Sequence, residues 1–224
     1  MLEGCQLFKV DSAPFNADHR PDLGATAFLR FYAQDLPYSR VIYVDSDTVV
    51  TDSLAPLFRQ RLPVMARGYD LPLALEFSDP SLASARLPLF DGFPVLNSGV
   101  MAFSVPYLRE IDALGRCQAL AREFGWEFFL NPDQGMWITI AYLTGGFGRL
   151  PPQYNFMTWS DMAPAKGKIT TSSTGHLTAV GTSGPARVLH WVGGVKPWHF
   201  DKHNFSQEKR AALFEDCYLQ FNQP

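Results

Sequence analysis

The segment Val41-Ile-Tyr-Val-Asp-Ser-Asp-Thr-Val-Val50 is the part of the chain from which a fold can be argued most directly. Its first four residues are β-branched or aromatic, which is typical of a buried strand. This strand runs into two carboxylates, Asp45 and Asp47, and side chains in a strand repeat with a period of two, so we expect both on one side. Acid adds nothing to the packing of a buried strand. The segment therefore predicts a strand that presents two carboxylates for a divalent cation or for catalysis.

The acid pair also has two other interpretations. In the first, the strand ends in a turn, with Asp45 as a capping residue and Asp47 in water. In the second, residues 45–49 are the first motif, Asp-x-Asp-x-Thr/Val, of a haloacid-dehalogenase-like phosphohydrolase. Such an enzyme needs a later acidic pair for Mg²⁺, and the sequence contains neither a Gly-Asp nor an Asp-Asp dipeptide. Phosphoryl hydrolysis is therefore the weaker interpretation.

The composition fits one globular domain. The chain has 224 residues, of which 46% are hydrophobic, and a formal net charge of −3, which allows a sizeable core. The absence of a basic stripe argues against nucleic-acid binding. No apolar run is long enough for a transmembrane helix, which leaves only peripheral membrane association open. Cys5, Cys117 and Cys217 are far apart in the sequence, which favours a reducing compartment such as the cytoplasm.

Predicted strands alternate with predicted helices along the chain, which favours an α/β fold. The predicted strands cover residues 6–11, 41–44, 64–67, 97–103 and 187–191. The predicted helices cover residues 24–36, 54–62, 107–124, 133–143 and 205–221. Residues 70–95 are predicted to form a long ordered loop, and the polar residues 160–185 a flexible loop.

A second candidate site follows the last predicted strand, in Leu189-His-Trp-Val-Gly-Gly-Val-Lys-Pro-Trp198. His190 can supply an imidazole ligand to a metal. Paired glycines at 193–194 let backbone N–H groups approach an anion closely, and Lys196 offers a point charge for a phosphate. The alternative is that His190 is a packed, hydrogen-bonded core residue beside Trp191.

Three further polar positions have both a structural and a functional interpretation. Asn97 begins an apolar strand, where its amide either caps a turn or binds a polyol. Asp133 and Gln134 follow Pro132 at a helix start, where they act either as first-turn capping residues or as part of a site. Arg30 lies among aromatic residues on a helix, where it either extends to solvent or takes part in a site.

Taken in order, these segments resemble glycosyltransferase family 8, whose members are retaining, metal-dependent enzymes of the GT-A fold. The resemblance extends from about residue 6 to residue 200. It rests on Arg30, Asp45-Ser46-Asp47, Asn97-Ser98-Gly99, Asp133-Gln134, Leu150-Pro-Pro-Gln-Tyr-Asn155 and His190-x-x-Gly193-x-x-Lys196-Pro-Trp198. It implies a mixed sheet flanked by helices, with residues 1–224 as a single GT-A-like catalytic domain.

The resemblance also implies a role for each matched residue. Asp45, Asp47 and His190 look like the ligands of Mn²⁺, with Mg²⁺ as the alternative, since carboxylate oxygens with one imidazole suit these ions. Gly193 and Lys196 look like the cradle for the donor diphosphate. The other matched residues look like the wall around the nucleotide-sugar donor: Arg30, Ser46, Asn97, Ser98, Asp133 and Gln134.

The implied reaction moves a hexosyl group from a UDP-sugar to a hydroxyl of a sugar or other acceptor, with retention of configuration. Breaking the anomeric C–O bond builds negative charge on UDP, which a bound metal and Lys196 would stabilise. Retention requires either a protein nucleophile, for which Asp133 and Gln134 are the candidates, or attack by the acceptor on the same face. Both routes stay open.

The sequence departs from the family pattern at its beginning. Family members usually carry a further segment, which holds uracil and ribose, before the strand that matches residues 6–11. We therefore expect an N-terminally truncated GT-A fold with an incomplete base pocket and weak donor binding. A non-catalytic, glycosyltransferase-like remnant is the alternative to an active enzyme. A plant-type relative would imply the Golgi lumen instead of the cytoplasm.

Overall fold

The computed structural model describes residues 8–9, 25–62, 64–69, 95–125, 132–158, 168–175, 177–181 and 184–192. The predicted strand over 6–11 lies mostly outside these residues, and Phe8 and Lys9 belong to neither a helix nor a strand. The predicted loop over 70–95, apart from its last residue, and the predicted helix over 205–221 also lie outside the described residues.

The helical elements are η2 (Ala25–Asp35) and η5 (Pro152–Asn155), which are 3-10 helices, and α1 (Ala55–Phe58), α4 (Val105–Glu110), α5 (Ala113–Phe124) and α6 (Pro132–Thr144). The strands are β1 (Arg40–Val44), β2 (Thr48–Val50), β3 (Val64–Tyr69), β4 (Val95–Ser104), β5 (Phe147–Arg149), β6 (Phe156–Met157), β7 (Lys168–Thr171), β8 (Leu177–Gly181), β9 (Gly184–Pro185) and β10 (Val188–His190). These bounds confirm the predicted strands over 41–44, 64–67, 97–103 and 187–191 and the predicted helices over 24–36 and 133–143. The helix predicted over 54–62 is shorter than expected.

The chain divides into two compact units. The first comprises residues 1–41, 69–96 and 103–146, and the second comprises residues 42–68, 97–102 and 147–224. The first unit contains helices η2, α4, α5 and α6, whereas most of the strands belong to the second. Whether residues 1–224 act as a single catalytic domain stays a prediction.

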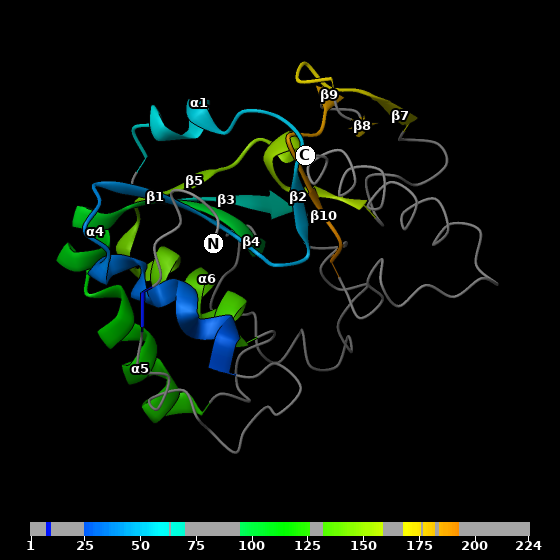
Figure 1. The fold of residues 1–224 in the computed structure, drawn as a ribbon. Coiled ribbons are helices and arrows are strands. Elements are labelled where there is room, and N and C mark those ends of the chain that lie inside the picture. Colours follow the sequence, from blue (N-terminus) through cyan, green and yellow to red (C-terminus); the bar gives the residue numbers. More distant parts are fainter. Residues whose placement is uncertain are drawn as a thin grey trace. The chain divides into compact units, whose positions relative to one another are not determined.

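The core of the first unit is built around a buried indole. Trp137 of α6 stacks on Phe31 of η2, with ring centroids 4.3 Å apart, and on Phe103, with centroids 5.1 Å apart. All three side chains are fully buried, and aromatic pairs of this kind contribute about 0.5–1.5 kcal/mol beyond the area they bury. Helix α5 contacts both η2 and α6, so the blue η2 lies beside the green helices in Figure 1.

The helix predicted over 107–124 is interrupted, which corrects the sequence-based expectation. The break lies between α4 and α5, where Asp112 adopts a left-handed conformation with φ of 47°. Its carboxylate accepts a hydrogen bond from the Gly115 backbone N–H and so caps α5. Aspartate is among the few residues that tolerate this conformation, and it is also a favoured helix cap. Asp112 therefore ends one helix and begins the next.

The strands of the second unit belong to three sheets with the orders β1-β4-β3-β5, β2-β10-β6 and β7-β8-β9. In the first sheet, β3 pairs with β5 in parallel, and β4 is buried on both faces from Leu96 to Phe103, as expected of a central strand. In the second sheet, β10 pairs with β2 in an antiparallel arrangement and with β6 in parallel. This second sheet brings the residue pair Leu189 and His190 next to β2, although β2 lies far away in the sequence.

The third sheet lies where the sequence predicted a flexible loop over 160–185. Strand β7 pairs with β8 over four residue pairs, and β8 pairs with β9, both antiparallel. The turn after β7 is tied to the end of β2, because Ser173 donates a hydrogen bond to Asp52 and Thr174 donates one to the Thr51 carbonyl. The expectation of a loop was therefore wrong for the strand residues 168–171, 177–181 and 184–185.

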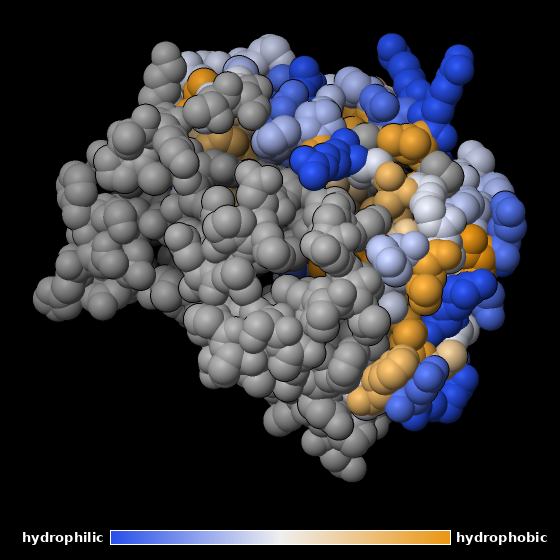
Figure 2. Space-filling model, turned by 180° about the vertical axis from the view of Figure 1, so that it is seen from behind, coloured by the Kyte–Doolittle hydropathy of each residue, from blue (hydrophilic) through white to orange (hydrophobic). Residues whose placement is uncertain are grey.

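Hydrophobic and hydrophilic side chains alternate over the described surface shown in Figure 2. Several large apolar side chains are exposed, among them Phe58, Tyr142 and Leu143. Within the described ranges, no helix is both long enough and apolar enough to cross a membrane.

Candidate metal centre

Asp45 and Asp47 lie at a tight turn that joins β1 to β2. Asp45 directly follows β1, Ser46 and Asp47 form the turn, and β2 begins at Thr48. The Thr48 hydroxyl donates a hydrogen bond to the Asp45 carbonyl at 2.7 Å, which holds the turn. The Asp45 N–H donates to the Gly99 carbonyl at 2.8 Å. Asp45 and Asp47 therefore converge because the chain turns between them, and not because they alternate along one strand as the sequence suggested.

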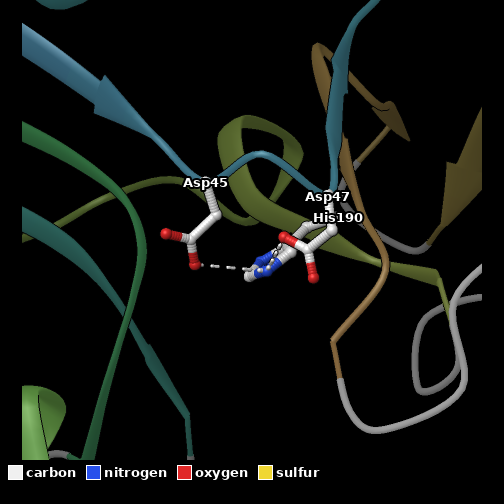
Figure 3. Close-up of side chains that lie close together, drawn as sticks. All are labelled: Asp45, Asp47 and His190. Atoms are coloured by element: carbon white, nitrogen blue, oxygen red, sulfur yellow. Dashed lines mark ion pairs between the residues drawn. The ribbon is translucent and has the colours of Figure 1, made fainter. Parts of the chain in front are cut away.

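The third member of the cluster arrives on β10, from a distant part of the chain. His190 pairs with Thr48 across the β2–β10 ladder, and the Trp191 N–H donates to the Asp47 carbonyl at 3.0 Å. This register places the imidazole next to the turn. Figure 3 shows the carboxylates of Asp45 and Asp47 directed towards the ring of His190.

The distances in this cluster fit a divalent cation. His190 Nε2 lies 3.4 Å from Asp47 Oδ1 and 3.8 Å from Asp45 Oδ2. One potential ligand atom from each of the three residues lies within 4.8 Å of the other two. Adjacent ligands of an octahedral ion with bonds of about 2.1 Å are about 3 Å apart. Two carboxylate oxygens and one imidazole nitrogen therefore form a group that could hold a divalent cation.

Burial raises the significance of the cluster. His190 is 3% exposed and Asp47 is 8% exposed. Carboxylates are rarely buried to this extent unless they are paired or bind a metal. The interpretation of Asp47 as a solvated turn residue is therefore wrong.

The ring of His190 rests in space that a glycine leaves open. A Cβ atom added to Gly99 would clash with the imidazole of His190, above all with Cε1. Gly99 is buried in β4 and follows two buried polar residues, Asn97 and Ser98. The glycine of the Asn97-Ser98-Gly99 motif therefore has a steric function at the site, which the sequence analysis did not assign.

Two further residues, Tyr43 and Asn155, form hydrogen bonds with members of the cluster. The Tyr43 hydroxyl donates to Asp45 Oδ1 at 2.5 Å, which leaves Oδ2 on the side of His190. On the other side, His190 Nδ1 lies 2.8 Å from Asn155 Oδ1, and Asn155 is fully buried. Sequence reasoning gave neither residue a role. The sequence signals for these residues were the position of Asn155 at the end of the Leu150–Asn155 motif and the position of Tyr43 two residues before Asp45.

The first unit contains a separate pair of predicted site residues. Arg30 Nη1 lies 3.3 Å from Asp133 Oδ2, and both side chains are buried. The Arg30 Nε–H also donates to the Ala27 carbonyl at 3.0 Å. Gln134, the next residue of α6, is 8% exposed. Arg30 therefore does not extend to solvent, and the first turn of α6 holds a charged residue with a specific partner.

Three of the remaining predicted site residues lie within the described part of the chain, and two lie outside it. Asn97 and Ser98 are buried in β4, and Ser46 is exposed in the turn between the two carboxylates. Asn97 accepts hydrogen bonds through Oδ1 from Asn155 Nδ2 and from the Gly99 N–H. Gly193 and Lys196, the predicted phosphate cradle, lie outside the described residues.

Comparison with known proteins places these residues in a family. Residues 10–202 match the family model described as glycosyl transferase family 8. The chain is 29% identical over 190 residues to the glycosyltransferase GlyB of Streptococcus pneumoniae and 26% identical over 208 residues to a probable glycosyl transferase Gly of Streptococcus gordonii. These alignments cover 82% and 86% of this chain but only 40% and 26% of the relatives. The chain thus spans well under half the length of either relative.

Solved structures show the same fold. The galactosyltransferase LgtC, in complex with donor and acceptor sugar analogues, superposes with a TM-score of 0.65 at 21% identity, over 96% of this chain and 75% of LgtC. The glycosyltransferase GlyE of Streptococcus pneumoniae superposes with a TM-score of 0.53 at 19% identity, over 85% of this chain and 43% of GlyE. The fold is GT-A, a mixed α/β architecture.

These matches decide between the families that the acid pair allowed. They place the chain in a glycosyltransferase family rather than among haloacid-dehalogenase-like phosphohydrolases. Both curated relatives are streptococcal, so neither supports a Golgi location. The chain belongs to glycosyltransferase family 8.

Proposed function

We propose that the chain forms the metal- and donor-binding part of a retaining glycosyltransferase that moves a hexosyl group from a UDP-sugar to a hydroxyl acceptor. The observation that carries the proposal is the convergence of Asp45, Asp47 and His190 on one point, with Nε2–carboxylate distances of 3.4 and 3.8 Å. Family membership supports glycosyl transfer as the reaction class.

Asp45, Asp47 and His190 would hold Mn²⁺, with Mg²⁺ as the alternative. When bound, the ion supplies Lewis-acid stabilisation of the negative charge that develops on the departing nucleoside diphosphate. The protein's own contribution is a fixed ligand set: Tyr43 orients one carboxylate, and the β2–β10 register fixes the imidazole beside the other. Gly193 and Lys196 are proposed to bind the diphosphate through backbone N–H groups and a positive charge.

The donor wall is proposed to consist of Arg30, Ser46, Asn97, Ser98, Asp133 and Gln134. Asp133 and Gln134 are the candidates for a direct catalytic role, as a nucleophile or as groups that stabilise the sugar during same-face attack. Arg30 acts on Asp133 through the 3.3 Å ion pair and so fixes the position of that carboxylate.

The test measures metal-dependent nucleotide binding. Calorimetry should show that UDP binds with Mn²⁺ present and that binding is lost on chelation. Asp47→Asn should weaken this binding by about 10-fold or more, because one charged ligand is removed from a site of three. Asp112→Asn is the matched control, since it makes the same chemical change at the α4–α5 turn and Asn also tolerates that backbone conformation.

Each result separates one interpretation from another. UDP affinity that is unchanged by chelation or by Asp47→Asn would contradict the metal site. Metal-dependent UDP binding, without hydrolysis or transfer from any UDP-sugar tried, would favour the non-catalytic remnant. Release of free sugar from a UDP-sugar that depends on both Mn²⁺ and Asp47 would support the enzyme.

A further inference from the structure

A chain of hydrogen bonds runs from the backbone of β4 to the imidazole of His190. The Gly99 N–H donates to Asn97 Oδ1 at 3.1 Å, Asn155 Nδ2 donates to the same oxygen at 2.7 Å, and Asn155 Oδ1 lies 2.8 Å from His190 Nδ1. Asn97, Asn155 and His190 are all buried, with exposed fractions of 6%, 0% and 3%. Water is therefore poorly placed to substitute for any of these contacts.

The direction of every bond in this chain follows from one backbone group. A backbone N–H can only donate, so the atom of Asn97 that faces Gly99 must be the oxygen. Because Asn155 meets that same oxygen, it must present its NH₂ group there, and it then presents its own oxygen to His190. Nδ1 of His190 must therefore carry a proton. The usual ambiguity of amide orientation and histidine tautomer is removed, since each amide is fixed by its neighbour.

The fixed directions of these hydrogen bonds determine whether Nε2, on the opposite side of the ring, has a lone pair. With its proton held on Nδ1, a neutral His190 has its lone pair on Nε2, the atom that lies 3.4 Å from Asp47 and 3.8 Å from Asp45. The other tautomer would place a lone pair against Asn155 Oδ1 and leave Nε2 unable to bind a cation. The hydrogen-bond chain therefore selects the form of imidazole that binds a metal.

We infer that Asn155 is the positioning residue of the metal centre: it holds His190 in the Nδ1-protonated tautomer so that Nε2 binds the divalent cation. This inference rests on the proposed metal site. Asn155 acts on the metal centre through His190, because its Oδ1 lies 2.8 Å from His190 Nδ1. Asn97 takes part as well, because its oxygen orients Asn155.

The experiment compares Asn155→Leu, which keeps the number and branching of the side-chain heavy atoms but removes both hydrogen bonds, with Asn155→Asp, which keeps an acceptor for Nδ1–H. Thr158→Val is the matched control. The Thr158 hydroxyl donates to the His190 carbonyl at 3.3 Å, and Thr158 is also buried, so this change disturbs the same residue without changing its ring.

Three quantities are measured on each purified variant: the melting temperature without metal, the dissociation constant for Mn²⁺ from the free-ion electron paramagnetic resonance signal, and the imidazole nitrogen coupling to bound Mn²⁺ in pulsed spectra. Asn155→Leu should raise the dissociation constant by about 10- to 100-fold and abolish the nitrogen coupling. Asn155→Asp should keep the nitrogen coupling and lose less affinity than Asn155→Leu, because it retains the acceptor for Nδ1–H although it loses the donor to Asn97. Thr158→Val should lower the melting temperature but leave both metal readouts unchanged.

Several results would overturn the inference. It fails if folded Asn155→Leu binds Mn²⁺ as the wild type does with its nitrogen coupling intact, or if Thr158→Val loses as much affinity. If Asn155→Leu does not fold, Asn155→Ala is measured with the same expectation. If the wild-type protein binds Mn²⁺ without nitrogen coupling, His190 is not a ligand of the ion, which contradicts the inference but not metal binding by the protein. Wild-type protein that binds no Mn²⁺ would contradict the proposed metal site itself, which distinguishes the two failures.

Discussion

Arg30 and Asp133 form a buried ion pair in the first unit, with 3.3 Å between Nη1 and Oδ2. The two residues lie on different helices, η2 and α6, which the stacked rings of Phe31 and Trp137 also join. The aromatic stack and the ion pair thus fix the same helix pair, one through packing and the other through charge.

We predict that Arg30→Met destabilises the protein, because it removes the positive charge that lies 3.3 Å from the buried Asp133 carboxylate. Removal of one member of a buried pair typically costs about 3–5 kcal/mol. The double variant Arg30→Met/Asp133→Leu should recover most of this loss, since two apolar residues replace the charges. Unfolding in urea measures both values without the screening that a salt denaturant would add. Equal destabilisation in the single and double variants would show that the charge of Asp133 is not the cause.

A second prediction concerns Gly99. Alanine normally strengthens a strand relative to glycine, but at this position its Cβ would clash with the His190 ring. Gly99→Ala should therefore lower the free energy of unfolding by about 1–3 kcal/mol, as overpacked cores do. It should also weaken Mn²⁺ binding, because the imidazole must move.

The control for this prediction is Gly175→Ala. Gly175 has φ of +86° and open space around the position of its Cβ, so the substitution brings backbone strain without a clash. The strain costs about 1–2 kcal/mol, but Mn²⁺ affinity should stay unchanged. Equal losses of Mn²⁺ affinity in the two variants would contradict the steric role of Gly99.

The third prediction is a pH dependence of stability that arises from Cys117. Burial, with a smaller contribution from the charge of Asp133, raises the pKa of the Cys117 thiol well above its ordinary value of 9.0. The unfolded chain therefore releases this proton at a lower pH than the folded protein does. The stabilising effect is complete below about pH 9 and is lost as the pH rises towards the folded pKa, by at most about 1.4 kcal/mol per pH unit.

Urea unfolding from pH 8 to pH 10.5 tests this dependence. Other groups also titrate in this range, so the quantity of interest is the difference between the wild type and Cys117→Ala. The wild-type advantage at pH 8 should shrink as the pH rises. A constant difference over the whole range would show that the thiol has an ordinary pKa.

The sequence predicted those parts of the site that depend on local pattern. The apolar run before Asp45 identified β1, and the ordered motifs supplied His190 as a partner for the two carboxylates. The reason for their convergence was not predictable, because a turn at residues 46–47 replaces the expected continuous strand. The partner of Asn155 depends on how β10 pairs with β6, where His190 lies opposite Met157. No local pattern encodes that register.

Two errors in the fold have physical causes that the residues show in retrospect. The Thr-Thr-Ser-Ser-Thr run at residues 170–174 is polar, which suggested a loop, but its first two residues belong to β7, since threonine is β-branched and favours strands. The break before α5 was missed because Ala, Leu, Arg and Glu dominate residues 107–124, and a single Asp at position 112 does not change that average. A capping residue acts through its own backbone conformation, which composition does not reveal.

The position of β10 in the middle of the sheet β2-β10-β6 has a consequence during protein synthesis. Both outer strands precede β10 in the sequence, so each leaves the ribosome before its pairing partner exists. Translation of the roughly 140 residues between Asp47 and His190 takes about 7–30 s at 5–20 residues per second. Throughout this interval the edge of β2 stays open to other chains, and the edge of β6 is open only for the last part of it. Asp45, Asp47 and His190 are therefore brought together only after most of the chain has been synthesised.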